Sequence, residues 1–201
     1  MGITKLTIKV SGIEDGKPIP AKFAYCQPDG KGRTVTGGNI SPAISWSGAP
    51  AGTKSYALIV VDPDVPAKFD TANKPGHVIA VDFPRQNFYH WVLADIPANM
   101  QGLPEGKNSG GVTPGGKPAG STEYGINGLN DYGFGGYDGP CPPWNDERLH
   151  HYHFIVYALD IASVGLSGPI KGQEVEAAIE GHVLAQGEVV GTYTTNGSLQ
   201  K

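Results

Sequence analysis

The sequence is poor in three features that would each point to a particular class of protein: cysteine, long apolar runs and excess basic charge. Two cysteines among 201 residues are too few for a disulfide-rich scaffold, and their spacing matches no zinc-binding pattern. The longest apolar runs stay far short of the roughly 20 residues needed to cross a bilayer. With 15 basic and 19 acidic residues, the chain has no basic surplus for binding nucleic acid. We therefore expect neither a transmembrane segment nor a nucleic-acid partner.

The N-terminus and the two cysteines bear on where the protein is found. Met1 is followed by a stretch without the charged, apolar and small-residue regions of a secretory signal. We expect a cytoplasmic protein, with an already processed precursor as the alternative. Cys26 and Cys141 leave two interpretations open. We favour unpaired thiols in a reducing compartment over a single bridge between an N-terminal loop and the Cys141 loop.

Glycine and proline, in contrast, are abundant, with 30 and 17 residues that make up nearly a quarter of the chain. Because they are interleaved with strongly apolar segments, they favour a turn-rich, mostly β domain over disorder. The segments 55–61 and 152–160 are apolar on both faces, which is typical of central strands. Periodicity predicts strands at 6–10, 44–46, 55–61, 78–83, 88–96, 152–160 and 188–193, and loops at 27–39 and 100–130.

A single helix is expected near the C-terminus. Val175, Ala178, Ile179 and His182 recur at helical spacing, and Gly187 is placed to end the helix. No internal repeat or domain linker is visible. Several strands and one late helix predict a mainly β fold, a two-sheet antiparallel sandwich that forms one domain over residues 1–201.

Polar and ionisable residues gather in three segments at the ends of apolar strands. Asp62 and Asp64 flank a proline directly after the central strand, which predicts a stiff turn that fixes both carboxylates. An ordinary Asp-Pro turn without a function is the alternative. His90 follows two aromatic residues in the second segment, where a buried core histidine is the alternative to a site residue.

The third segment contains four polar aromatic residues in succession. Residues two apart in a strand share a face, so His150 and Tyr152 point one way while His151 and His153 point the other. This histidine-rich stretch therefore cannot direct all its rings at one ligand. The proline-rich segment around Cys141 precedes it.

These residue types allow catalysis or metal binding but do not require either. Adequate ligands for zinc or iron are present, namely Asp62, Asp64, His90 and His150. No ligand spacing connects them, so we expect no metal and no other cofactor. No GxSxG elbow occurs and prolines crowd Cys141, so no catalytic residue is assigned. A phosphoester or carboxyl-ester hydrolase with Asp62 or Asp64 as base and His90 as acid is the enzymatic alternative.

Taken in order, the motifs of these segments resemble those of the phosphatidylethanolamine-binding protein family, in particular its bacterial and archaeal branch, which is often labelled Raf-kinase-inhibitor-like. They are Asp-Pro-Asp-x-Pro from residue 62, His-Trp-Val from residue 90, Gly-Pro-Cys-Pro-Pro from residue 139 and Leu-His-x-Tyr-x-Phe from residue 149. The resemblance runs from about Phe23 to Tyr193. It implies two antiparallel sheets with few short helices and a small anion-binding cavity at one end.

The same resemblance implies a set of ligand-binding residues. Carried over position by position, the set is Asp62, Asp64, Pro66, His90, Gly139, Pro140, Cys141, Pro142, His150 and Tyr152. The two histidine rings, the tyrosine hydroxyl and the Cys141 amide would donate hydrogen bonds to the anion. The two acids would orient the imidazoles from behind, and the prolines would keep the walls rigid.

The resemblance also implies a function and a class of partners. We expect a non-catalytic protein that binds a phosphate or phospholipid-headgroup anion and modulates kinases or other signalling enzymes. Inhibition of a protease or kinase through surface loops is a further alternative, and a homodimer is compatible with the sequence. Val65 replaces the usual alanine, and the loops 27–38 and 67–87 look longer than in the commonest bacterial members. Such loops could cover the cavity or form a partner surface.

Overall fold

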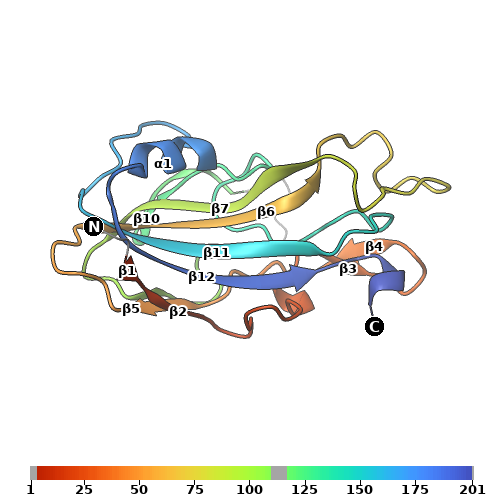
Figure 1. Cartoon of the computed structure of the whole chain (residues 1–201), viewed down its shortest axis with the longest axis horizontal. Coiled ribbons are helices and arrows are strands. Elements are labelled where there is room, and N and C mark those ends of the chain that lie inside the picture. The colour runs from red at the N-terminus through yellow and green to blue at the C-terminus, as the bar shows by residue number, and fades with distance from the viewer. Residues whose placement is uncertain (1–3, 110–116, 201) are drawn as a thin grey trace.

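The computed structural model describes residues 4–109 and 117–200, and its main element is a seven-stranded sheet. Neighbouring strands pair antiparallel, except that the short edge strand β1 runs parallel to β12. The long strands β6, β7, β11 and β12 lie at its centre (Figure 1). Across the sheet the order is β1 (Thr4–Lys5), β12 (Val183–Tyr193), β11 (His150–Leu159), β6 (Ser55–Pro66), β7 (Arg85–Pro97), β10 (Gly125–Asn127) and β9 (Gly120–Thr122).

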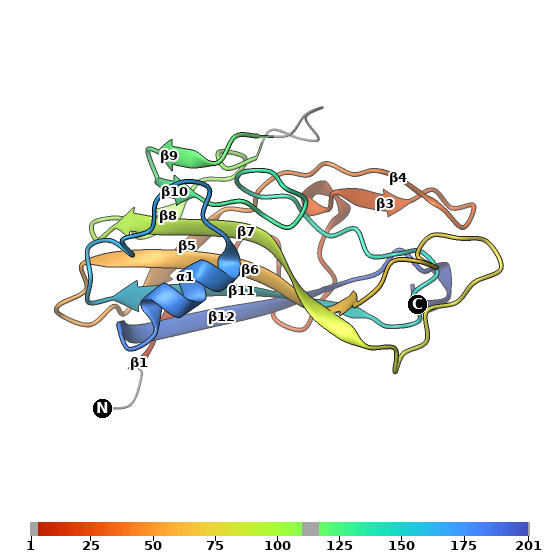
Figure 2. The same ribbon diagram turned by 90° about the horizontal axis from the view of Figure 1, so that it is seen from above.

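Smaller elements cover both faces of this sheet. On one face lies a three-stranded sheet, and on the other lies the helix α1, as Figures 1 and 2 show. Among the described residues, no helix is long and apolar enough to cross a membrane. The fold is mainly β with one helix near the C-terminus, which confirms the predicted class. The remaining elements are β2 (Thr7–Val10), β5 (Ile44–Ser47) and β8 (Gly102–Leu103) in the second sheet, the hairpin of β3 (Cys26–Pro28) and β4 (Thr34–Thr36), the helix α1 (Gly172–Ile179), and the 3₁₀ turns η1 (Ala21–Phe23) and η2 (Gly197–Leu199).

The two-sided apolar pattern of the central strands follows from this layering. In β6, Leu58 and Val60 pack into the core between the two sheets. The alternate residues Ile59 and Val61 pack on the opposite face, in the core beneath α1 that includes Val175. Each such burial contributes about 1.5–3 kcal/mol, so both faces of the strand stabilise the fold. The same arrangement accounts for β11, as the sequence predicted.

The strand predicted at residues 78–83 is wrong. These residues form turns between β6 and β7, and Val78 and Val81 are 63% and 52% exposed. Only Ile79 is deeply buried among the apolar residues of this stretch, and it forms an isolated bridge with Asp146. Alternating apolar residues thus occur here in a surface loop, in which only Ile79 packs into the interior.

The predicted end of the helix and two predicted loops also need correction. The helix α1 ends at Ile179, the chain turns at Gly181 (φ 80°), and β12 starts at Val183. Gly187 lies inside β12, where an added Cβ would approach the Leu6 carbonyl oxygen to 2.6 Å, so close strand packing explains this glycine. The expected loop at 27–39 contains most of the hairpin β3–β4, and the one at 100–130 contains β8, β9 and β10.

Candidate ligand-binding site

A small cavity of about 110 Å³ opens where β6, β7 and β11 meet two connecting segments, the one between β6 and β7 and the one between β10 and β11. It is well below the 300–1,000 Å³ of typical drug-sized sites, so it suits a small ligand. We call it the His90 pocket. Its lining consists of Asp62, Val65, Phe69, Ala72, Asn73, Phe88, His90, Tyr132, Cys141, Pro142, Pro143, His150 and Tyr152. Six of the ten predicted site residues are therefore brought together, from strands and loops that are far apart in the sequence.

A β-bulge places His90 in this pocket. The register between β6 and β7 pairs Val60 with Trp91 and Val61 with Tyr89, which leaves His90 without a direct partner. Tyr89 packs beneath α1 and Trp91 packs between the sheets, while the His90 ring contacts Tyr152 of the core between the sheets. Bulges commonly redirect a side chain next to a site in this way. Strict alternation along β7 would not have placed His90 and Trp91 on the same side.

The His90 ring is held among aromatic rings and by one backbone group. Its centroid lies 5.0 Å from Phe88, 5.6 Å from Tyr132 and 5.1 Å from Tyr152. Its Nδ1 lies 2.8 Å from the carbonyl oxygen of Asp138. Its Nε2 is buried without a hydrogen-bond partner in the described part of the chain. Because buried polar atoms are nearly always paired, this nitrogen marks a place where a ligand group is expected.

His150 lies between two buried carboxylates. Its Nδ1 is 2.6 Å from Asp62 Oδ2, and its Nε2 is 3.2 Å from Asp146 Oδ2. On the far side of Asp146, Arg85 donates two hydrogen bonds of 2.6 and 3.0 Å to the Asp146 carboxylate. We expected His150 to donate a hydrogen bond to the ligand, but both its ring nitrogens face carboxylates. It therefore contributes charge to the site and orients Asp62.

The charge state of His150 follows from these contacts. Burial disfavours the imidazolium, but the hydrogen bonds to Asp146 and Asp62 outweigh burial and raise the pKa of His150 to about 9. Burial likewise opposes ionisation of Asp146, yet its hydrogen bonds to His150 and Arg85 lower the pKa of that carboxyl. At neutral pH the four residues Asp62, His150, Asp146 and Arg85 thus form a chain of alternating charges with no net charge.

Asp64 does not line the pocket, although it was predicted to do so. The register of β6 with β7 shifts between Asp62 and Val65, which turns Val65 into the pocket and Asp64 to the other side. There Asp64 bonds Arg148 Nε at 2.5 Å and His151 Nδ1 at 2.7 Å. Burial alone would raise the pKa of Asp64, but these two partners lower it. Both acids are also part of β6 itself, not of the turn that was predicted to follow it.

Three further predicted residues stand behind the walls of the pocket. Pro66 ends β6, and Gly139 and Pro140 lead into the wall formed by Cys141 and Pro142. Gly139 donates its N–H to Asn39 Oδ1 at 2.8 Å and passes so close to the Phe23 carbonyl that no Cβ would fit. The left-handed φ of 49° at Asn39 suits an asparagine. These residues support the site without lining it.

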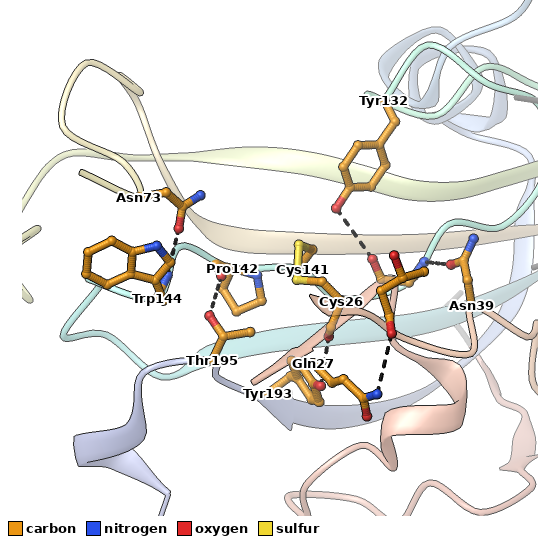
Figure 3. The surroundings of a disulfide bond; sticks show 12 residues. Cys26, Gln27, Asn39, Asn73, Tyr132, Cys141, Pro142, Trp144, Tyr193 and Thr195 are labelled. Atoms are coloured by element: carbon orange, nitrogen blue, oxygen red, sulfur yellow. Dashed lines mark hydrogen bonds between the residues drawn. A yellow bond between two sulfur atoms is a disulfide. The ribbon is translucent and has the colours of Figure 1, made fainter. Parts of the chain in front are cut away.

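The structure decides between the two interpretations of the cysteines. Cys26 of β3 and Cys141 form a disulfide, with Cα atoms 5.0 Å apart (Figure 3). The preferred prediction of free thiols is therefore wrong. The bond ties the hairpin β3–β4 to the pocket wall, and Tyr193 Oη donates to the Cys26 carbonyl at 2.9 Å. Sequence spacing alone could not show that two positions 115 residues apart meet.

Several lining residues were not among the predicted ones. They are Val65, Phe69, Ala72, Asn73, Phe88, Tyr132 and Pro143. Phe88 precedes a predicted site residue by two positions, so strand alternation was a usable signal. Asn73 belongs to the long loop after β6. It joins that loop to the opposite wall, because its side-chain oxygen accepts from Trp144 N (Figure 3) and its N–H donates to Asn145 Oδ1. In the described residues, no group of three or more His, Cys, Asp or Glu is arranged to hold a metal ion.

Comparisons with known proteins show the family of the chain. The family model of the phosphatidylethanolamine-binding proteins matches residues 9–194. A UPF0098 protein of Methanothermobacter thermautotrophicus is 34% identical over 188 residues, which cover 94% of this chain and 98% of that protein. A UPF0098 protein of Pyrococcus horikoshii is 35% identical over 193 residues, with coverages of 96% and 79%.

Solved structures give the same result. Escherichia coli YbcL, described as a new member of the mammalian PEBP family, has a TM-score of 0.71 at 27% identity, covering 95% of this chain and 99% of its own. CT736 of Chlamydia trachomatis, described as a putative homologue of the family, has a TM-score of 0.65 at 28% identity, with coverages of 94% and 97%. The chain belongs to the phosphatidylethanolamine-binding protein family.

Proposed function

We propose that this protein binds a small oxyanion, of the phosphate or phospholipid-headgroup kind, in the His90 pocket without converting it chemically. The observation that carries the proposal is the buried Nε2 of His90, which has no hydrogen-bond partner among residues 4–109 and 117–200, in a pocket of about 110 Å³. A buried polar atom without a partner is costly, by about 1–3 kcal/mol. A ligand that completes its hydrogen bonding would recover that free energy.

The remaining lining supplies a small number of hydrogen-bond donors. The Tyr152 hydroxyl stays protonated, because burial and the nearby Asp62 carboxylate raise its pKa well above the ordinary value. Burial also raises the pKa of the Tyr132 hydroxyl, whose bond to the Gly139 carbonyl is long at 3.5 Å. Between Gly139 and Pro143 three of five residues are prolines without an N–H, so the Cys141 amide is the candidate backbone donor there.

The arrangement favours binding over catalysis. The hydrolase considered from the sequence would need Asp62 or Asp64 as a free base and His90 as an acid, yet Asp62 is held by His150 and by the Asp64 N–H at 2.8 Å. Asp64, the other base considered, faces Arg148 and His151 outside the pocket. The prolines of the wall keep the pocket in shape before the ligand arrives, which reduces the entropic cost of binding.

Titration with inorganic phosphate tests the proposal. The ring signals of the histidines would be followed by NMR in the wild type, in His90→Ala, and in His153→Ala as the matched control, since His153 pairs with Glu188 outside the pocket. We expect the His90 signals to shift saturably at millimolar phosphate, with binding lost in His90→Ala and kept in His153→Ala. Unmoved His90 signals would contradict the proposal. Hydrolysis of p-nitrophenyl phosphate that disappears in His90→Ala would replace binding by catalysis.

A further inference from the structure

The hydrogen-bond role of His90 is set by the atom behind it. Its Nδ1 lies 2.8 Å from the Asp138 carbonyl oxygen, and a carbonyl oxygen can only accept. The proton of the neutral ring must therefore be on Nδ1. The opposite nitrogen, Nε2, then carries a lone pair and faces the pocket as an acceptor. This reverses the donor role that the family resemblance implied for His90.

The surroundings of His90 favour this neutral form. Desolvation lowers the pKa of His90, while the Asp62 charge and the bond to the Asp138 carbonyl oppose that effect only in part, and the His150 charge adds to it. The Asp138 carboxylate is itself occupied, since Lys117 Nζ lies 3.0 Å from it. The two tyrosine hydroxyls near the ring stay protonated and carry no charge.

A fully deprotonated oxyanion does not fit beside this nitrogen. All its oxygens are acceptors, so placing one against Nε2 would oppose two lone pairs and leave the buried nitrogen unsatisfied. An oxyanion that carries an O–H can donate it to Nε2 and use its other oxygens to accept from the hydroxyls and the amide. The four residues Asp62, His150, Asp146 and Arg85 carry no net charge together. Because the protein offers no excess positive charge here, a ligand with one negative charge is favoured over a ligand with two.

We propose that the His90 pocket selects protonated oxyanions, such as the monoanion of a phosphomonoester, with the proton held between a ligand oxygen and His90 Nε2. This inference rests on the proposed function and specifies its ligand class. A phosphomonoester loses its second proton near pH 6. Above that pH each molecule bound must take up one proton from solvent, so the affinity falls about tenfold per pH unit. A phosphodiester has no O–H and lacks this donor.

Calorimetric titration of the full chain with three probes tests the inference. Methyl phosphate carries an O–H as its monoanion, whereas methyl sulfate and dimethyl phosphate carry the same charge without one. At pH 5.5 we expect methyl phosphate to bind at least tenfold more tightly than the other two. At pH 7.5, in two buffers of different ionisation enthalpy, we expect uptake of close to one proton per methyl phosphate bound.

The outcomes separate this inference from the proposed function. Equal binding of methyl phosphate and methyl sulfate without proton uptake would overturn the inference and leave anion binding in place. Absence of binding by all three probes would overturn both. His90→Gln places an amide N–H near the position of Nε2, and this N–H can donate to either anion. We therefore expect the variant to bind methyl sulfate as tightly as it binds methyl phosphate. Retained discrimination against the sulfate in His90→Gln would contradict the role given to His90. The proton count in the wild type tests the inference without any variant.

Discussion

The disulfide yields a prediction whose size can be worked out from its place in the chain. The bond joins residues separated by 115 positions, so it removes a large closed loop from the freedom of the unfolded chain. Loop-closure entropy of about 2.1 + 1.5R ln n cal/mol/K gives about 4.8 kcal/mol at 25 °C for a loop of this length. Replacing both cysteines by alanine should lower the free energy of unfolding by nearly that amount. For a domain of this size, the melting temperature should drop by about 10–20 °C.

The experiment compares urea unfolding of the oxidised wild type with that of the Cys26→Ala, Cys141→Ala double variant. The matched control is the wild type with its disulfide reduced and both thiols alkylated, which should lose similar stability if loss of the cross-link is the cause. Native mass measurement with and without reduction counts the thiols independently. A stability loss below about 1 kcal/mol, or two free thiols in the native protein, would refute this reasoning. Disulfides persist mainly in oxidising compartments, so the same measurement bears on the cytoplasmic location predicted from the sequence.

Two other predictions concern the pocket and its supports. Because the pKa of His150 is raised to about 9 from an ordinary value near 6.5, its contribution to stability is complete below pH 6.5 and is lost as the pH rises through 9. Urea unfolding between pH 6 and 10 should show the free energy of unfolding fall by an amount on the order of 3 kcal/mol. A free energy of unfolding that does not change with pH over this range would contradict the pairing of His150 with the two carboxylates. Gly139→Ala should cost about 1–3 kcal/mol and weaken phosphate binding, because its Cβ would clash with the Phe23 carbonyl. Gly197→Ala is the control, since its Cβ would meet nothing within 4 Å, and equal stability of both variants would exclude the clash.

The central strands could be predicted because both faces of each pack against a core, although the face of β11 beneath α1 is only half-buried. Residues 55–61 and 152–160 are apolar at nearly every position, and each face packs in its own core. The residues of either face therefore predict a central strand. The shared face of His150 and Tyr152 followed from strand alternation alone. Both residues line the pocket.

The register shifts could not be predicted from the sequence. Alternation treats every strand as regular. The register shift at Val60 and Val61, however, places His90 on the same side of the sheet as Trp91, and the shift after Asp62 turns Asp64 away from the pocket. Such shifts arise from pairing with the neighbouring strand, which local sequence does not encode. Asp146 was missed for a related reason. Its role beside His150 depends on a loop returning to the sheet, and no spacing signals that contact.

The site divides into parts that tolerate change differently. Asp62, His90, His150 and Tyr152 belong to hydrogen-bonded central strands, where any insertion would shift the pairing of the whole ladder. Phe69, Asn73 and the proline-rich wall belong to connections that can lengthen or shorten without disturbing those strands. Natural variation could therefore reshape the entrance, and with it the tail attached to the bound group, while the chemistry at the bottom stays the same. An engineer who wants a new selectivity in this scaffold should randomise the entrance and leave the strands alone.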